Sequence, residues 1–370
     1  MRIGIDARTI QGRHTGDGTY WRGLIEGLSR VDSENDYIIY FDARIPQPEI
    51  ALSASMRVRI LAAVTGRMWS AWSFPRALRE DGVQLAHVQY TVPPAMPCPV
   101  VTTVHDVSFK RLPEYFNLKD RLILDLGMRQ ADRKAARIIA VSEYTKSEIV
   151  SLYGIHPDRI DVTYEGADER FKPMDRDIAC EAVKEKYGLK CQFVLTVGVI
   201  QPRKNFPRLL EGFAKFKSLG QSEHKLIVAG KYGWKESGLN DLIEKLGITR
   251  EVVFAGYVPH GDLPIFYNTA DLFVYPSVYE GFGLPPLEAM SCGTPVITGN
   301  RSSLPEVVGE AGIMVDPYDP GAFGDAISRV LSSESLRTDM SARGLEQAKK
   351  FSWDKMARQT VDVYRKAAGK

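Results

Sequence analysis

"FVLTVGVIQPRKNFPRLLEGF" (residues 193–213) contains the pattern that decides the fold class. An apolar, β-branched run is followed by a turn with proline and two cations, and apolar residues then recur at helical spacing. The start of the chain repeats this order with different residues, in "RIGIDARTIQGRHTGDGTYWRGLIEGL" (2–28). A strand that leads through a short turn into a helix is the building unit of parallel α/β sheets.

The same alternation runs through most of the 370 residues, which is a comfortable length for two domains. Strands are predicted at 2–6, 36–41, 100–106, 137–142, 161–166, 193–198, 225–230, 252–258, 271–277, 295–299 and 312–316. Helices are predicted at 205–219 and 239–248 among others, and a last helix, 353–367, could pack on either domain, including back onto the first. We therefore predict an α/β protein with two Rossmann-like domains, 1–170 and 171–352, joined near the polar stretch "DERFKPMDRD" (168–177). Ligands of such sheets bind at the carboxyl ends of the strands, so a cleft between the domains is expected to hold the site.

Composition narrows the class of protein. The formal net charge is +2, which gives no indication of nucleic-acid binding. The basic stretch "RQADRKAAR" (129–137) has helical spacing, which favours a solvated helix face over a patch for a polyanion or a membrane. Four scattered cysteines without a C-x-x-C pair favour a reducing compartment over a disulfide framework or a zinc site. A strand-like run at the start and the lack of a 20-residue apolar run predict a cytoplasmic protein, either free or peripherally attached at the membrane face.

Two candidate sites follow strands of the first half. Gly16, Asp17 and Gly18 lie between the first strand and a helix expected to begin near Thr19, where amides could approach an anion, although a plain turn explains them equally well. No G-x-G-x-x-G or P-loop pattern is present, which argues against a dinucleotide dehydrogenase or a P-loop enzyme.

The second site in this half is "VHD" (104–106), where His105 and Asp106 end an apolar strand. This histidine could bind a sugar hydroxyl or act as an acid or base, and it could equally be satisfied by the backbone at a strand end.

Two further candidates follow strands of the second half. Arg203 and Lys204 stand at a helix start, against the usual preference of cations for the other end, which suggests an anion such as a diphosphate between them and the helix. "EGFGLPPLE" (280–288) places Glu280 on a glycine loop and Glu288 in the following helix, closed by Gly293. Carboxylates accept hydrogen bonds from vicinal hydroxyls, so one glutamate could hold a sugar and the other a ribose.

"EGFGLPPLEAMSCGTPVI", together with "VGVIQPRKN" and "VHD", resembles the retaining nucleotide-sugar glycosyltransferases of family four, which have the GT-B fold. "TVHDVSFKRLPEYF" (103–116) and "PRKN" are most similar to the bacterial branch that builds O-antigen, capsule and exopolysaccharide chains with mannose or rhamnose donors. The resemblance implies that the glycines at 16 and 18 approach the donor diphosphate and that His105 reaches the donor sugar. It also implies that Arg203 and Lys204 clamp the diphosphate.

The same resemblance implies that Glu280 holds sugar hydroxyls and that Glu288 binds the ribose. The backbone around Tyr257 and Val258 would border the base. The remaining substrate-binding candidates are Asp106, Gly281, Phe282, Gly283 and Leu284. One departure is "TYEGAD" (163–168), which has Glu165 where many relatives have asparagine, so the role of this position does not carry over.

The expected reaction is transfer of a hexose, with GDP-mannose as the favoured donor, to a glycan or lipid-linked saccharide. Two carboxylates would suggest a covalent intermediate, but both are assigned to hydroxyls, so we expect front-face substitution without a metal or other cofactor. The alternatives are a sugar phosphorylase or a sucrose- or trehalose-type synthase on the same fold. A non-catalytic nucleotide-sugar binding protein is a further alternative. Expected partners are the donor, the acceptor and the inner membrane, with no nucleic acid.

Overall fold

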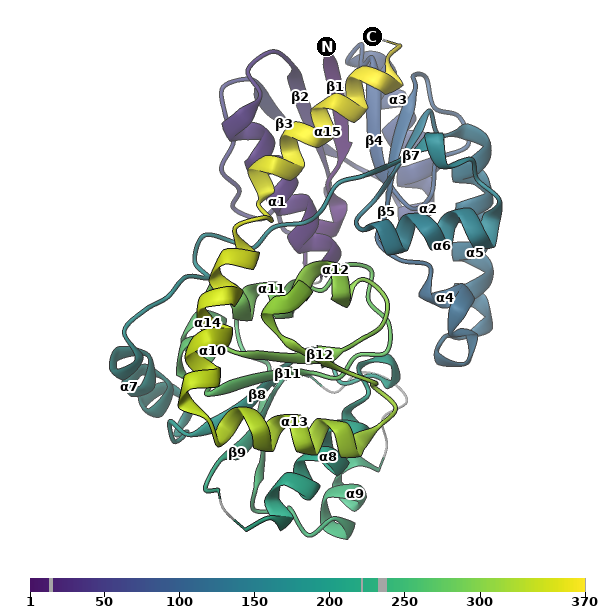
Figure 1. The fold of residues 1–370 in the computed structure, drawn as a ribbon. Coiled ribbons are helices and arrows are strands. Elements are labelled where there is room, and N and C mark those ends of the chain that lie inside the picture. Colours follow the sequence, from purple (N-terminus) through teal and green to yellow (C-terminus); the bar gives the residue numbers. More distant parts are fainter. Residues whose placement is uncertain (13–15, 221, 232–237, 370) are drawn as a thin grey trace. The chain divides into compact units, whose positions relative to one another are not determined.

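The computed structural model describes residues 1–12, 16–220, 222–231 and 238–369. The chain divides into two compact units, unit 1 with Met1–Gly166 and Phe351–Lys370, and unit 2 with Ala167–Lys350. Each has its own parallel sheet (Figure 1). Within the described residues, no helix combines the length and the apolarity that crossing a bilayer requires.

The sheet of unit 1 has the strand order β3-β2-β1-β4-β5-β6-β7. Its strands are β1 (Arg2–Asp6), β2 (Asp36–Asp42), β3 (Met56–Leu61), β4 (Leu85–Gln89), β5 (Val100–Val104), β6 (Arg137–Ala140) and β7 (Ile160–Val162). All adjacent strands are parallel. The order reverses at β1 and β4, and such a reversal opens a ligand-binding crevice at the carboxyl ends of the two strands.

Helices and short turns connect the strands of unit 1. They are η1 (Arg8–Ile10), α1 (Gly16–Val31), α2 (Gly66–Met68), η2 (Trp69–Ser73), α3 (Phe74–Glu80), α4 (Ser108–Arg111), η3 (Pro113–Tyr115), α5 (Leu118–Lys134), α6 (Glu143–Tyr153), η4 (Pro157–Arg159) and α15 (Trp353–Ala367). The predicted strand runs of this half each contain or overlap a strand, whereas β3 and β4 were not predicted.

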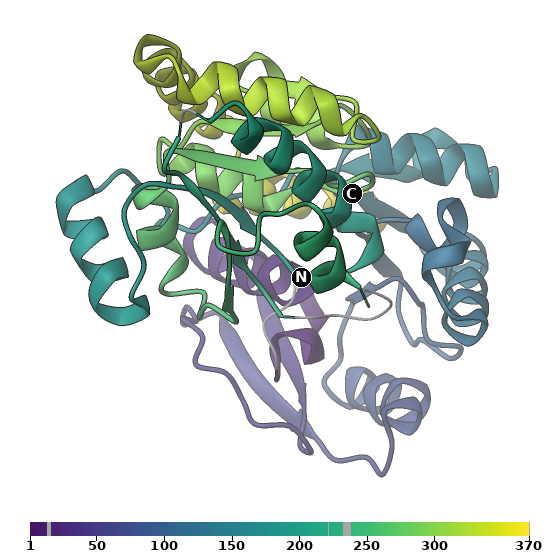
Figure 2. The same ribbon diagram turned by 90° about the horizontal axis from the view of Figure 1, so that it is seen from below.

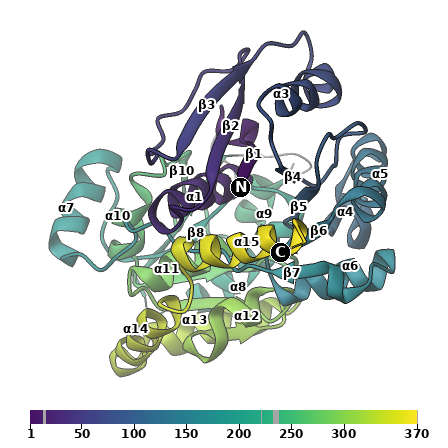
Figure 3. The same ribbon diagram turned by 90° about the horizontal axis from the view of Figure 1, so that it is seen from above.

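The last helix, α15, packs on α1 of unit 1 (Figures 1 and 3). Two glycines of α1 allow the close approach. A Cβ added at Gly23 would lie 2.2 Å from the Trp353 ring, and one at Gly27 would lie 2.7 Å from the Trp353 carbonyl oxygen. Tyr364 of the same helix reaches the core and is fully buried. Glycine at these two positions therefore fixes where the end of the chain docks.

The sheet of unit 2 has the order β10-β9-β8-β11-β12-β13, again with parallel pairs. Its strands are β8 (Phe193–Val197), β9 (Lys225–Ala229), β10 (Val252–Gly256), β11 (Leu272–Tyr275), β12 (Val296–Gly299) and β13 (Ile313–Val315). The order reverses at β8 and β11, so the loops after these two strands lie at the expected ligand-binding point.

The helices of unit 2 pack on its sheet and on one another, with α8 against α13 (Figure 2). They are α7 (Arg176–Tyr187), η5 (Pro202–Lys204), α8 (Phe206–Ser218), α9 (Leu239–Lys245), α10 (Leu263–Thr269), α11 (Leu284–Ser291), α12 (Leu304–Val308), η6 (Gly309–Ala311), α13 (Pro320–Leu331) and α14 (Glu334–Ala348). A Cβ at Gly324 of α13 would lie 2.8 Å from the Gly212 carbonyl oxygen of α8, so this contact also requires glycine.

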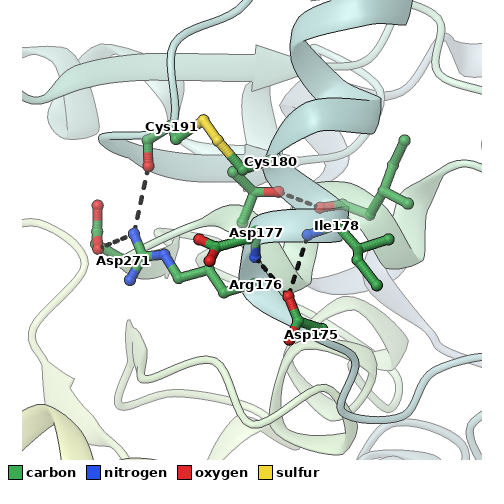
Figure 4. Close-up of a disulfide and its surroundings, with 9 residues drawn as sticks. Asp175, Arg176, Asp177, Ile178, Cys180, Cys191 and Asp271 are labelled. Carbon is green, nitrogen blue, oxygen red and sulfur yellow. Dashed lines mark hydrogen bonds and ion pairs between the residues drawn. A yellow bond between two sulfur atoms is a disulfide. The ribbon is translucent and has the colours of Figure 1, made fainter.

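The expectation that the cysteines form no disulfide is wrong for one pair, because Cys180 and Cys191 are bonded (Figure 4). Gly188 ends α7 with a φ of +66°, which reverses the chain and returns residue 191 to the side of the helix. The two Cα atoms are 5.5 Å apart, a normal disulfide separation. Arg176 adds a second link here, since it donates to the Cys191 carbonyl oxygen and pairs with Asp271. Spacing in the sequence could not reveal this chain reversal.

Candidate functional site

The loops after β8 and β11 are held together by hydrogen bonds at the point where the strand order of unit 2 reverses. The backbone N–H of Val278 donates to the Arg203 carbonyl oxygen at 2.9 Å. Asn205, in the left-handed conformation with a φ of +58°, donates to the Pro276 carbonyl oxygen. The two predicted motifs "PRKN" and "EGFG" therefore form one local structure.

Arg203 and Lys204 lie in the short turn η5, immediately before α8, and not in the first turn of that helix. The ammonium of Lys204 donates to a carboxylate oxygen of Glu280 at 2.6 Å and also to the hydroxyl of Tyr275. One guanidinium nitrogen of Arg203 is 3.7 Å from the other carboxylate oxygen of Glu280. The predicted cation pair and the first predicted glutamate thus meet.

Glu280 is buried, and its Oε1 accepts three hydrogen bonds. The donors are Lys204 at 2.6 Å, Ser277 at 2.5 Å and the Tyr275 hydroxyl at 3.0 Å. Burial alone opposes ionisation, but the charges of Lys204 and Arg203 and these hydrogen bonds outweigh it and lower the pKa of Glu280. The carboxylate is therefore charged at neutral pH.

The second oxygen of Glu280, Oε2, has a different environment. Among the described residues it makes no hydrogen bond, and its ion pair with a guanidinium nitrogen of Arg203 spans 3.7 Å, which is longer than a hydrogen bond. An ionised carboxylate oxygen without a close donor is a strong acceptor for a hydroxyl of a ligand.

The backbone of "EGFG" is fixed from the other side by α12 and the residues before it. The Ser303 hydroxyl donates to the Phe282 carbonyl oxygen at 2.6 Å and lies 3.0 Å from the Glu280 carbonyl oxygen, and Ser302 accepts from the Glu280 N–H. Gly283 caps α11 with a φ of +118°, a conformation that favours glycine. Predicted members Phe282 and Leu284 continue the segment, the first buried and the second half-buried at the start of α11.

Glu288 lies in α11 and is also buried, but its neighbours differ from those of Glu280. Its Oε2 accepts a hydrogen bond from the Tyr267 hydroxyl at 2.9 Å, and its Oε1 is 3.7 Å from Nε2 of His260. The two glutamates of the motif are therefore chemically distinct, one beside two cations and the other beside a phenol and an imidazole.

Tyr257 and Val258 follow β10 at the carboxyl edge of the sheet. The Tyr257 ring is 48% exposed, and the ammonium of Lys231 lies 4.2 Å from its centre. Val258 is buried. These residues lie at the same edge of the sheet as Lys204, with β9 between β10 and β8.

In unit 1, His105 follows β5 and is 7% exposed. Its Nδ1 is 3.4 Å from a carboxylate oxygen of Glu165, and its Nε2 makes no hydrogen bond with any described residue. Burial would lower the pKa of His105, but the carboxylates of Asp17, Glu165 and Asp106 outweigh it and raise the pKa. The predicted neighbour Asp106 uses one oxygen to accept from the N–H and hydroxyl of Ser108, which starts α4.

The glycines of the first strand–helix turn are part of the helix itself. α1 begins at Gly16, so the expectation of a start near Thr19 is wrong, and the preceding residues 13–15 lie outside the described part of the chain. A Cβ at Gly16 would meet nothing within 4 Å, whereas Gly18 is buried.

Sequence reasoning missed several polar residues of these clusters. Tyr275 and Ser277 end the run "DLFVYPS", and polar groups at the end of an apolar strand were a usable signal for them. Tyr267 and His260 carry no such signal, because they contact Glu288 from α10 and from the loop before it. For Glu165, the sequence showed only a departure from the family's pattern and not its contact with His105.

Comparison with known proteins agrees with this geometry. Residues 15–171 match the family model "Glycosyltransferase Family 4", and residues 181–347 match "Glycosyl transferases group 1". O-antigen chain mannosyltransferase B of Escherichia coli is 41% identical over 269 residues, covering 72% of this chain and 70% of that protein. The serotype-specific mannosyltransferase WbdA of Escherichia coli is 32% identical over 62% of this chain. The matched segment covers only 29% of the length of WbdA.

Among solved structures, sucrose-phosphate synthase from Thermosynechococcus elongatus superposes with a TM-score of 0.78 at 20% identity, covering 99% of this chain and 98% of the other. At that identity the likeness concerns the fold, and it agrees with the two parallel sheets described above. The chain belongs to the group 1 and family 4 glycosyltransferases, and it is a hexosyltransferase with the GT-B fold.

Proposed function

We propose that this glycosyltransferase moves a mannose-type hexose from a nucleoside-diphosphate sugar, with GDP-mannose favoured, to a glycan or lipid-linked saccharide, with retention of anomeric configuration. The observation that carries the proposal is the cluster in which Lys204 and Arg203 meet the ionised carboxylate of Glu280. Cations suit a diphosphate, and a carboxylate suits the hydroxyls of a sugar. The choice of mannose rests on the names of the relatives.

The surroundings of Glu280 favour binding over covalent catalysis. Its Oε1 already accepts three hydrogen bonds, one of them from the ammonium of Lys204. A carboxylate that is neutralised in this way is a weak nucleophile, so a glycosyl–enzyme ester at Glu280 is disfavoured. We assign Oε2 to the sugar hydroxyls, and we assign the acceptor's proton to the departing diphosphate in a front-face substitution.

Arg203 and Lys204 are assigned to the charge that develops on the leaving diphosphate, and no metal is needed for this role. Replacement of Lys204 by alanine should lower turnover more than donor binding, since the leaving-group charge is greatest in the transition state. The same logic predicts that transfer persists when divalent ions are removed with a chelator.

The test is a donor panel of GDP-, UDP-, ADP- and dTDP-sugars, followed by thermal unfolding. A ligand at 100 times its Kd adds about 2.7 kcal/mol to stability, so the preferred donor should give the largest rise in Tm. With that donor and a mannosylated acceptor, proton NMR of the first product formed should show the α-anomer. A β-linked product, or loss of transfer in chelator with intact donor binding, would contradict the proposed mechanism.

We also propose that the enzyme attaches peripherally to an anionic membrane surface through the α5 face, defined as Leu118, Leu122, Ile123 and Leu126 with the cations of the same helix. For the part of the helix from residue 129 onward, this proposal replaces the expectation of a solvated face. The four apolar side chains are between 47% and 67% exposed, which is unusual for one helix. α5 contains five lysine or arginine residues and three aspartates. Exposed apolar side chains beside an excess of cations fit a bilayer with anionic headgroups.

Vesicle co-sedimentation tests this attachment. The wild type should bind vesicles with anionic lipid more than neutral ones, and Leu122→Ser with Leu126→Ser should weaken binding by about tenfold or more, because each buried CH₂ contributes about 0.8 kcal/mol. Ile60→Ser is the matched control, since Ile60 is similarly exposed but lies on β3. Equal binding by the control and the double variant would refute the assignment to α5.

A further inference from the structure

Unit 1 contains two buried histidines close together, and their surroundings favour different charge states, neutral for His87 and positive for His105. His87 on β4 is fully buried, with Nδ1 2.7 Å from the Tyr364 hydroxyl and Nε2 2.8 Å from the Thr103 hydroxyl. Neither partner is charged at neutral pH. Burial, with a smaller effect from the charge of His105, lowers the pKa of His87 to about 3. His87 is therefore a neutral core residue.

His105 is buried to a similar degree but faces acids from several elements. Glu165 follows β7 and lies 3.4 Å from Nδ1, and Asp17 approaches from α1. Asp106 is its neighbour in the chain. The other titratable groups facing it are His87 and two phenols, Tyr20 and Tyr90, whose rings lie 4.7 and 5.8 Å from the imidazole.

The geometry leaves one nitrogen of His105 for a ligand. With Nδ1 directed at the Glu165 carboxylate, the remaining nitrogen Nε2 is buried and makes no hydrogen bond with any described residue. A buried N–H without an acceptor costs about 1 to 3 kcal/mol. Without a ligand, the Nε2–H of His105 therefore destabilises the folded protein. Such an unpaired buried donor is expected where a bound substrate supplies the acceptor.

We propose that Glu165 is a positioning residue that holds His105 as an imidazolium, with Nδ1–H on the carboxylate and Nε2–H available to an oxygen of the donor sugar. The part of this inference that concerns the sugar rests on the function proposed above. A neutral side chain such as asparagine at this position would have no charge to hold a cation. Together with Asp17, Glu165 favours the histidine of this chain as a charged donor, and charge-assisted hydrogen bonds are roughly twice as strong as neutral ones.

The charge state can be measured without any substrate. In protein labelled with ¹⁵N-histidine, the His105 ring nitrogens should titrate above the ordinary value of about 6.5. Glu165→Gln and Glu165→Asn should each lower that midpoint by about one pH unit or more, the usual effect of losing an opposite charge at this distance. Glu49→Gln, which removes an exposed carboxylate of unit 1, is the control and should leave the midpoint in place.

Kinetics test the role in transfer. The basic limb of the pH profile of kcat/KM should move to lower pH in Glu165→Gln by the same interval as the NMR midpoint. An unchanged NMR midpoint in both folded variants would overturn the proposed charge. A shifted midpoint with an unmoved kinetic limb would overturn the positioning role. If no donor is transferred at all, the proposed function fails, while the NMR titration still decides the charge of His105.

Discussion

Acidification should destabilise unit 1 well before its carboxylates are protonated, because of His87. The histidine has a pKa of about 3 when folded and about 6.5 when unfolded. Between these values the unfolded chain binds more protons than the folded one, so the free energy of unfolding falls as the pH falls. The pKa of His105 is raised by folding, so its contribution to the free energy of unfolding is already complete below pH 6.5. His105 therefore adds almost no pH dependence to the stability in the range where His87 acts.

The magnitude follows from the two pKa values of His87. One proton taken up on unfolding gives a slope of about 1.4 kcal/mol per pH unit. From pH 6.0 to pH 4.5 the expected loss is about 2 kcal/mol, since the unfolded imidazole is already partly protonated at pH 6.0. Asp32 and Asp42 have lowered pKa values, so their contributions are lost mainly below about pH 4.

Urea unfolding followed by tryptophan fluorescence measures this loss. Four of the five tryptophans (21, 69, 72 and 353) belong to unit 1, so the signal is dominated by that unit. His87→Gln should flatten the pH dependence between pH 6.0 and 4.5. His156→Gln, at a histidine whose side chain is 70% exposed, should leave it unchanged. Equal slopes in wild type and His87→Gln would refute the reasoning, whatever the absolute stability of the variant.

Two other substitutions separate the assigned roles. Glu280→Gln should reduce turnover by a factor of about 100 and leave binding of the free nucleoside diphosphate nearly intact, while Glu288→Gln should weaken that nucleotide by about 1 to 3 kcal/mol. Calorimetry with the free diphosphate decides the matter, and the reverse order would show the assignment to be wrong. Gly23→Ala places a Cβ 2.2 Å from the Trp353 ring and should destabilise unit 1 by about 1 to 3 kcal/mol in urea unfolding, whereas Gly16→Ala on the same helix meets nothing and should not. Equal stability of the two alanine variants would contradict the close packing of α15 on α1.

Much of the α/β architecture was predictable because strands and helices have local signatures. The apolar run of β8, the following turn and the 3.6-residue spacing of α8 lie within 26 residues of one another, from Phe193 to Ser218. The bounds of α15, Trp353–Ala367, are those that the periodicity predicts. Neither β3 nor β4 forms a continuous apolar run. "MRVRIL" alternates apolar residues with arginines, a pattern that itself favours a half-buried strand and was a usable signal, and "LAHVQ" is interrupted by a histidine.

Local sequence patterns show where the strands end, and therefore that His105, Lys204 and Glu280 are polar groups near the edge where parallel sheets bind ligands. What each of these groups touches depends on long-range contacts of the folded chain. Lys204 and Glu280 are 76 positions apart, and His105 and Glu165 are 60 apart. No local preference of the chain specifies such pairs, because they form only when strands distant in sequence become neighbours in one sheet. Those neighbours lower the pKa of Glu280 and raise the pKa of His105, through charges and hydrogen bonds that outweigh burial, so the chemistry of the site depends on the fold.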